Sequence, residues 1–348
     1  MILVNNPGDW GHLWSPLSHA EWHGCTPTDL VFPFFLFIVG TAGAFSLRRR
    51  GAAGESGAHL ARHAFTRGMT IALWGWLMAW YPFGWDRLER LRIPGVLPRI
   101  GVVFVLGTWV VLLAGRRRVP ALLAAVAALL ALHTALLSLP GYDLTRDGNL
   151  QKAIDLALLK GHLWKKDWDP EGILSTLTAV ATMLTGTLAG TLLVSSRSLR
   201  TRAGLLALCG VAGMGAGLCW ARALPLNKNL WTGSYVLFTS GAAAAGLALC
   251  ILLVDVRGRA GLLSFFLPFG RNPLLAFVGS GLLAKTMGLV KVGGAGGKAV
   301  SLQRWLFAHG FSWIHDPVVA SHAYAVAFIL LWWTILAWCD RRGYYWKI

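Results

Sequence analysis

Long apolar stretches recur along the chain from residue 30 onward, and each is about as long as a helix that crosses a bilayer. They lack the ten-residue alternation of apolar and polar positions that is typical of membrane β-strands. A helix satisfies its backbone hydrogen bonds within one segment, as lipid requires. The pattern predicts an all-α polytopic transmembrane helical bundle with nine full spans, near residues 30–47, 68–83, 96–114, 119–139, 173–194, 203–221, 233–254, 272–290 and 320–339.

The connections add little further structure. The opening "MILVN" is apolar like the end of a helix but is too short to span, so we expect a truncated first helix and a native chain that starts upstream of Met1. "GGAGG" (293–297) predicts a flexible connection, and Ser301–Phe311 predicts a short interfacial helix. We expect a single domain over residues 1–348.

Composition agrees with a membrane protein, because 55% of residues are hydrophobic and 14% are charged. The net charge of +17 would point to nucleic acid in a soluble protein. Here the basic residues form short clusters after every second span, as the positive-inside rule requires of cytoplasmic loops. These clusters are Arg48–Arg50, Arg116–Arg118, Arg197–Arg202, Arg257–Arg259 and Arg341–Lys347. We therefore expect no nucleic-acid partner and a cytoplasmic C-terminus.

The same rule places Pro7–Asp29, residues 140–172 and Leu224–Thr232 on the extracytoplasmic side. Three span entrances there carry polar groups: Asp29 before the first span, Asp169 and Glu171 before another, and Asn227–Asn229 before a third. Helix capping and interfacial anchoring explain each one singly. Together they predict a polar outer vestibule, because an ionisable group at membrane depth is costly.

Three histidines, His12, His19 and His23, lie in the first outer loop. His19 and His23 would share a face if their segment were helical, and with Glu21 or Asp29 they could bind a metal. The alternative is that they are ordinary interfacial side chains. We expect no metal cofactor, and five scattered cysteines without a CxxC pair predict neither a zinc site nor a disulfide framework.

Basic and amide groups also begin two other spans. "GVLPRI" places Arg99 inside a span, and "FGRNPLLAF" places Arg271 and Asn272 at a helix start. We expect these groups on the cytoplasmic side, where the arginines could hold a phosphate or a thioester-bearing ligand. Snorkelling of Arg99 to a nearby interface is the alternative.

Several blocks, in order, resemble one known family. They are "LSHAEWHGCTPTDLVFPFFLFIVG", "IPGVLPRI", "WDPEGILSTLTAVATMLTGTLAG", "PLNKNLWTGSYVLFTSG", "PFGRNPLLAF" and "RRGYYWKI". The chain is similar over nearly its whole length to bacterial members of the heparan-α-glucosaminide N-acetyltransferase-like family of transmembrane acyltransferases. It departs from the family's pattern in lacking a "DVFRG"-like first segment, in having Pro98 where Gln is common, and in having no large lumenal domain.

The resemblance implies a multi-pass enzyme of the bacterial inner membrane. It would move an acetyl group from cytoplasmic acetyl-CoA, its co-substrate, to an amino sugar or glycan acceptor on the extracytoplasmic side. The resemblance leaves a homo-oligomer open. It implies catalytic roles for His19, Asp29 and Asn5. We assign the acceptor to Asn227, Lys228, Asn229, Glu171 and Trp22, and the donor to Arg99, Arg271 and Asn272.

Two mechanisms fit His19. Its imidazole could accept a proton from the attacking amine or hydroxyl, or it could itself attack the thioester and carry the acetyl group. Asp29 or Glu21 could orient the ring. The alternatives to an enzyme are a sugar or acyl-carrier transporter, whose span entrances would also be polar, and a non-catalytic scaffold or sensor.

Overall fold

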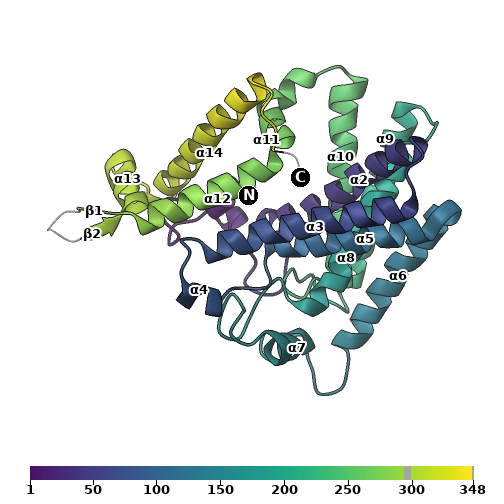
Figure 1. Cartoon of the computed structure of the whole chain (residues 1–348), viewed down its shortest axis with the longest axis horizontal. Helices are drawn as coiled ribbons and strands as arrows, with labels where there is room; N and C mark the ends of the chain where they lie inside the picture. Colours follow the sequence, from purple (N-terminus) through teal and green to yellow (C-terminus); the bar gives the residue numbers. More distant parts are fainter. Residues whose placement is uncertain (294–298, 347–348) are drawn as a thin grey trace. The chain divides into compact units, whose positions relative to one another are not determined.

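The computed structural model of the chain describes residues 1–293 and 299–346, apart from the side chain of Arg116. Helices make up nearly all of its regular structure (Figure 1). In the described part of the chain the strands are β1 (Lys291–Gly293) and β2 (Ala299–Ser301), which pair antiparallel with Lys291 opposite Ser301. The predicted all-α polytopic fold is confirmed. Residues 294–297 of the predicted flexible connection lie outside the described residues.

The chain forms two compact units. The first unit consists of Met1–His19, Thr26–Thr28 and Ala260–Ile348, and the second of Ala20–Cys25 and Asp29–Arg259. Helices of the first unit are α1 (Ile2–Asn5), α11 (Leu267–Arg271), α12 (Pro273–Leu289), α13 (Leu302–Phe311) and α14 (Pro317–Arg341). The interfacial segment predicted over Ser301–Phe311 is thus a helix, α13.

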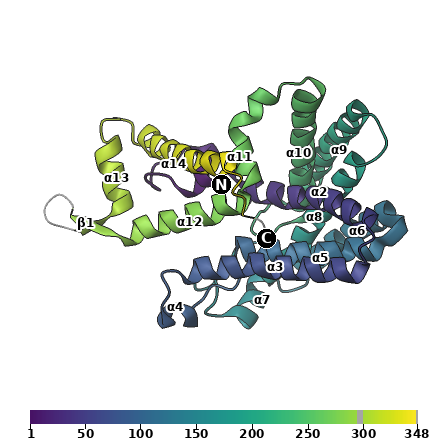
Figure 2. The ribbon, with the colours of Figure 1, turned by 45° about the horizontal axis from the view of Figure 1, so that its top comes forward.

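The second unit holds the remaining α-helices. They are α2 (Val31–Ala52), α3 (Gly57–Trp80), α4 (Trp85–Glu89), α5 (Val96–Ala114), α6 (Arg118–Leu137), α7 (Leu150–Leu159), α8 (Ile173–Leu193), α9 (Leu199–Trp220) and α10 (Gly233–Ile251). Within this unit α2 packs on α8, α3 on α5, and α9 on α10 (Figures 1 and 2).

Seven helices of the described chain are long and apolar enough to cross a membrane: α2, α5, α6, α8, α9, α10 and α14. A bent pair, Ala260–Arg271 with Pro273–Leu289, raises the number to eight if its two arms, which meet at 71°, form one span. The remaining predicted span, 68–83, overlaps α3, whose first half is interrupted by Arg62, His63 and Arg67. The total of nine spans stays a prediction.

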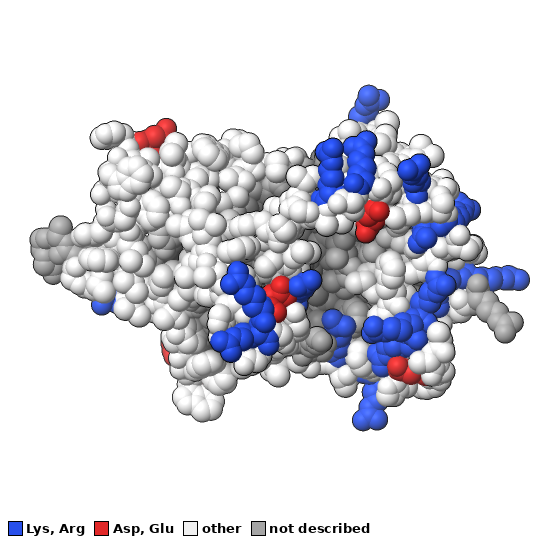
Figure 3. All heavy atoms as spheres, turned by 90° about the horizontal axis from the view of Figure 1, so that it is seen from above, with Lys and Arg blue, Asp and Glu red and all other residues white. Residues whose placement is uncertain are grey.

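The basic clusters of the second unit all lie at or just after the C-terminal end of a helix. Arg48–Arg50 end α2, Arg116–Arg118 follow α5, Arg197–Arg202 follow α8, and Arg257–Arg259 follow α10. Lys and Arg side chains dominate the charged groups over this unit in the view of Figure 3. The starts of α2, α5, α8 and α10 are therefore the helix ends that the basic clusters leave unoccupied.

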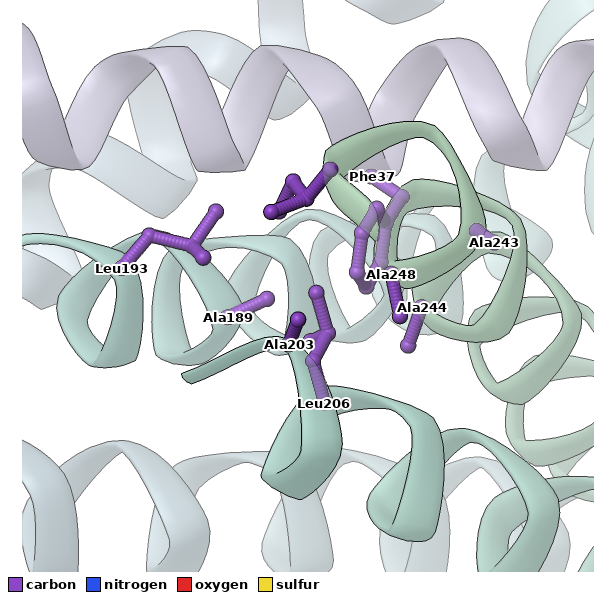
Figure 4. Close-up of a cluster of buried hydrophobic side chains, with 9 residues drawn as sticks. Phe37, Ala189, Leu193, Ala203, Leu206, Ala243, Ala244 and Ala248 are labelled. Carbon is purple, nitrogen blue, oxygen red and sulfur yellow. The ribbon is translucent and has the colours of Figure 1, made fainter. Parts of the chain in front are cut away.

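Small residues bring the helices of the second unit close together. Phe37 of α2 lies among side chains of α8, α9 and α10, many of them alanines (Figure 4). Between α2 and α8, a Cβ added to Gly40 would meet the carbonyl oxygen of Met183, and one added to Gly186 would meet that of Phe37. Thr41 Oγ1 donates to the Gly186 carbonyl at 3.0 Å. In lipid, where apolar surface gains little by leaving the solvent, such close backbone contact is what holds helices together.

Gly186→Ala is therefore expected to destabilise the protein by about 1–3 kcal/mol, because α2 and α8 must separate to admit a methyl group. The thermal unfolding midpoint in detergent measures the effect. Gly43→Ala is the matched control, since Gly43 lies in α2, the partner helix of α8, and a Cβ there meets nothing within 4 Å. Equal midpoints for the two variants would show that the helix contact is not tight.

A buried polar layer as candidate active site

Charged and amide side chains gather where α2, α5, α8 and α10 of the second unit begin. We call the following set the polar layer: Asp29, Arg92, Arg99, Gln151, Asp155, Asp169, Glu171, Ser175, Asn227 and Lys228. Most of them are almost fully buried, and Asp169, Ser175, Gln151 and Asn227 are wholly so. The structure thus brings together the three polar entrances that the sequence shows separately.

Asp29 joins the start of α2 to that of α10. Its carboxyl is 1% exposed, and Oδ2 accepts a hydrogen bond from the Ala20 backbone N–H at 3.1 Å. Lys228 Nζ lies 3.6 Å from Oδ1. The Tyr235 hydroxyl of α10 donates to the Asp29 backbone carbonyl at 2.6 Å. The charge of Asp29 is therefore compensated by a cation and an N–H group from separate segments.

Lys228 is presented by a turn that its neighbours hold. Asn227 Oδ1 accepts the Leu230 N–H at 2.8 Å, and the Thr232 hydroxyl donates to the Pro225 carbonyl at 2.9 Å. Burial lowers the pKa of Lys228, while the negative charge of Asp29 acts against that shift. A desolvated lysine of this kind is suited to bind an oxygen-rich ligand.

The first outer loop reaches the same turn. The Gly24 N–H donates to the Leu226 carbonyl at 2.7 Å, and Asn227 Nδ2 lies 3.3 Å from His23 Nδ1. Burial lowers the pKa of His23. The loop is thereby fixed to the turn that carries Lys228.

Arg92 holds the acidic segment before α8. Its Nε and Nη2 donate to the two carboxyl oxygens of Asp169 at 2.8 and 2.7 Å, and Nη2 also contacts Glu171. Burial lowers the pKa of Arg92, but the two carboxylates outweigh burial and the pKa is raised overall. This two-pronged contact gives both charge compensation and a fixed orientation.

Arg99 lies in the first turn of α5 and is 3% exposed. Nη2 donates to the Gly172 carbonyl at 2.8 Å and to Ser175 Oγ at 2.6 Å. The guanidinium carbon lies 5.3 Å from the centre of the Trp231 ring, a distance suited to a cation–π contact. Within the described residues, Nε and Nη1 have no hydrogen-bond partner. Arg99 therefore has N–H donors to offer a ligand.

This placement differs from the expectation that Arg99 lies on the side of the basic clusters. Arg116–Arg118 follow the end of α5, whereas Arg99 stands at its start, beside the α8 entrance. Its guanidinium donates to the Gly172 carbonyl and to Ser175 Oγ, so hydrogen bonds within the second unit hold it without snorkelling to the headgroups.

Gln151 and Asp155 of α7 were missed from the sequence. They lie four residues apart on the buried face of α7, and Asp155 Oδ1 accepts the Ile173 N–H at 2.9 Å. Burial raises the pKa of Asp155 to about 6. The stretch "LQKAIDLALL" has helical periodicity that indicates a short helix, but it falls between two predicted spans and does not show what the helix contacts. Arg92 was missed because it sits among several other arginines.

The histidines of the first outer loop do not form the arrangement that the sequence allowed. Residues 18–26 are not helical, so the i,i+4 arrangement of His19 and His23 does not occur. His19 is exposed and belongs to the first unit, directly before Ala20. His12 Nδ1 instead pairs with Asp9 Oδ2 at 2.7 Å. Among the residues that the structure describes, no three His, Cys, Asp or Glu side chains are grouped to hold a metal ion.

Two predicted residues differ in exposure, since Trp22 is half-buried and Asn5 is exposed. Trp22 donates from Nε1 to the Leu144 carbonyl at 2.8 Å and packs edge-on against Trp168 at 5.0 Å between ring centres. Asn5 ends α1 and is exposed. Trp22 thus forms part of the wall beside the polar layer.

Arg271 and Asn272 secure the C-terminal segment of the first unit. Arg271 Nη1 donates to both carboxyl oxygens of Asp340, at 3.0 and 2.7 Å. Asn272 Nδ2 donates to the Tyr344 carbonyl at 2.8 Å, and its Oδ1 accepts the Trp346 N–H at 2.8 Å. A ligand at Arg271 would therefore share the guanidinium with Asp340.

Comparison with known proteins gives two curated relatives. The chain is 30% identical over 343 residues to the heparan-alpha-glucosaminide N-acetyltransferase of Homo sapiens, covering 80% of this chain and 50% of that protein. It is 29% identical over 353 residues to the Mus musculus protein of the same name, covering 81% and 51%. The chain thus spans about half the length of the curated relatives it matches. No protein-family model matches the chain.

Arg92→Gln is expected to lower the stability of the protein by up to about 3 kcal/mol, because Asp169 and Glu171 would keep their charges without a buried partner. Thermal unfolding of the purified variant measures this loss. Arg90→Gln, two residues earlier and exposed, is the matched control and should unfold like the wild type. An Arg92→Gln variant as stable as this control would contradict the role assigned to Arg92.

Asp155 should make stability fall as pH rises. Its folded-state pKa of about 6 exceeds the ordinary value of about 3.9, so folding takes up a proton between these pH values. The stabilisation is complete below pH about 4 and is lost as pH rises through about 6. Asp155→Asn should therefore exceed the wild type in stability at pH 8 by up to roughly 3 kcal/mol, and match it at pH 4.

Unfolding midpoints of both proteins from pH 4 to pH 8 test this expectation. Asp147→Asn is the control of opposite sign, because a hydrogen bond from Lys152 lowers the pKa of Asp147. A wild type that gains stability relative to Asp155→Asn between pH 4 and pH 8 would show that the Asp155 carboxyl is not penalised by burial.

Proposed function

The chain belongs to the heparan-α-glucosaminide N-acetyltransferase-like family, and from this premise we propose that it transfers an acetyl group from acetyl-CoA to an amino sugar or related glycan acceptor. The observation that carries the proposal is the polar layer, which gathers cations, carboxyls and amides at the starts of four membrane-length helices. Its members include Asp29, Arg99 and Lys228, each of which a family block provides. The 30% identity to the human acetyltransferase supports the reaction class.

His19 is the proposed centre of the chemistry. Neutral imidazole accepts a proton from the acceptor amine as that amine attacks the thioester carbonyl. Alternatively, the imidazole attacks first, and the acetyl group passes through an acyl-imidazole. In both routes the carbon–sulfur bond breaks, a carbon–nitrogen bond forms, and a proton converts the leaving thiolate to CoA thiol. Asp29 stabilises the imidazolium, and Asn5 supports the catalytic histidine.

The cationic residues have separate proposed tasks. Arg99 offers unpartnered N–H groups, which suit the oxygen of the thioester as negative charge develops on it. Lys228, with Asn227 and Asn229, binds acceptor hydroxyls, and Glu171 and Trp22 complete that subsite. Arg271 and Asn272 bind phosphate oxygens of the donor, with Arg271 exchanging part of its contact with Asp340.

The proposed topology gives donor and acceptor different sides of the membrane. The basic clusters face the cytoplasm of a bacterial cell, with the C-terminus on that side, and the polar layer faces outward. Acetyl-CoA then arrives from the cytoplasm, and its thioester extends toward the starts of α2, α5, α8 and α10.

Release of CoA thiol from acetyl-CoA, with glucosamine as acceptor, tests the proposal. The wild-type protein should release thiol in a glucosamine-dependent manner, and His19→Ala should lower kcat by at least about 100-fold, since the general base or nucleophile is lost. His12→Ala is the matched control, because His12 lies in the same loop and pairs with Asp9 outside the polar layer.

Equal turnover by His19→Ala and His12→Ala would remove His19 from the mechanism. A wild-type protein that takes up sugar into vesicles without releasing thiol would replace the acetyltransferase with a transporter.

A further inference from the structure

Two side chains of helix α7 contact two parts of the polar layer, the first turn of α8 and the turn that carries Lys228. Gln151 and Asp155 lie on the same face of α7, because residues four apart in a helix are neighbours. Gln151 is fully buried and Asp155 is 1% exposed. A polar pair at this depth is costly unless its hydrogen bonds are used. The hydrogen-bond partners of this pair therefore indicate the structural role of α7.

The first set of partners is the opening turn of α8. Asp155 Oδ1 accepts the Ile173 N–H at 2.9 Å, and Gln151 Oε1 accepts the Ser175 N–H at 3.2 Å. The residue that precedes α8 is Gly172, which has no side chain to cap the helix. The α7 side chains thus supply the acceptors that an N-cap residue normally provides.

The same turn of α8 holds Arg99. The Gly172 carbonyl and Ser175 Oγ both accept from Arg99 Nη2. A Cβ on Gly172 would collide with Asp155 Oδ2, so the peptide between Gly172 and Ile173 lies between Asp155 on one side and Arg99 on the other. A displacement of Asp155 would therefore move the acceptor that orients Arg99.

The second partner lies in the Lys228 turn. Gln151 Nε2 donates to the Asn229 carbonyl at 3.0 Å. One amide side chain thus bonds α8 through its oxygen and the 227–229 turn through its nitrogen. In the described part of the chain, Asp155 Oδ2 has no hydrogen-bond partner, so the carboxyl acts through Oδ1 alone.

We propose that Gln151 and Asp155 are positioning residues, which set the distance between Arg99 and the Lys228 turn. Both bond from α7 to the turn of α8 that holds Arg99, and Gln151 also bonds to the Lys228 turn. They touch neither substrate in this role. The inference rests on the proposed function for its activity readout, but the coupling between the two segments is a property of the structure that can be measured without turnover.

Hydrogen–deuterium exchange of the full-length protein in detergent measures that coupling. Gln151→Met keeps the volume of the side chain and removes both bonds, so exchange should rise at residues 173–176 and at 226–232. Asp155→Leu should raise exchange at 173–176, whereas Asp155→Asn keeps an acceptor oxygen and should restore wild-type protection. Lys152→Met is the matched control, because Lys152 lies on α7 but pairs with Asp147 and Asp167 outside the polar layer.

Thiol release from acetyl-CoA with glucosamine supplies the second readout. Gln151→Met and Asp155→Leu should lower kcat/KM by about 10- to 100-fold, as expected when reacting groups are misplaced by a distant change. Asp155→Asn and Lys152→Met should stay within about threefold of the wild type. Wild-type activity in Asp155→Asn would show that the acceptor oxygen is what matters. Lowered activity in that variant would show that the carboxylate charge is required.

Each outcome decides a different point. Raised exchange in both segments of Gln151→Met, with lowered kcat/KM, supports the inference. Raised exchange with a wild type that releases no thiol supports the coupling and refutes the proposed acetyltransfer. Unchanged exchange at 226–232 in Gln151→Met, or an equal effect of Lys152→Met, overturns the inference.

Discussion

Compensation of buried charge is the constraint on which the rest of the structure depends. The polar layer holds three cationic side chains, of which Arg99 is 3% exposed and Lys228 and Arg92 are 18% and 27% exposed. A charge removed from water is stable only beside an opposite charge or oriented hydrogen-bonding groups. The carboxyl groups that pair with Lys228 and Arg92 are Asp29, Asp169 and Glu171. They come from the start of α2 and from the segment before α8, so the polar layer ties together helix ends that would otherwise be independent.

The close packing of the helices fixes the distances between the residues of the polar layer. Glycine and alanine allow α2 to approach α8, and the same helices place Asp29 and Ser175 at their starts. Because the backbones touch, a residue in the first turn of one helix has a nearly fixed distance to the next. Hydrogen bonds such as that from the Tyr235 hydroxyl to the Asp29 carbonyl then fix the helix starts relative to each other. Close packing and charge compensation therefore support the same geometry.

The polar layer also includes groups that lack a partner within the described chain. Arg99 keeps two nitrogens without an acceptor, and Asp155 keeps one oxygen without a donor. Proteins rarely bury such atoms without using them. In an acetyltransferase, a preorganised cation near the thioester stabilises charge as it forms, without the reorganisation that water would need. In the proposed acetyltransfer, the unpartnered nitrogens of Arg99 are the groups available to the thioester.

The sequence by itself determined the class of fold and the existence of the site's parts. Apolar runs of membrane length predict helices because lipid offers the backbone no hydrogen bonds, and polar residues such as Asp29 and Lys228 are conspicuous against those runs. The resemblance to an acetyltransferase family also follows from local blocks. The sequence could not show that Arg92, Gln151 and Asp155 join the site, because helical periodicity places Gln151 and Asp155 on one face of a helix but does not show what that face contacts. It also did not show that Arg99 lies with Gly172 and Ser175. Those facts depend on contacts between residues eighteen or more positions apart, which only the packing of the helices decides.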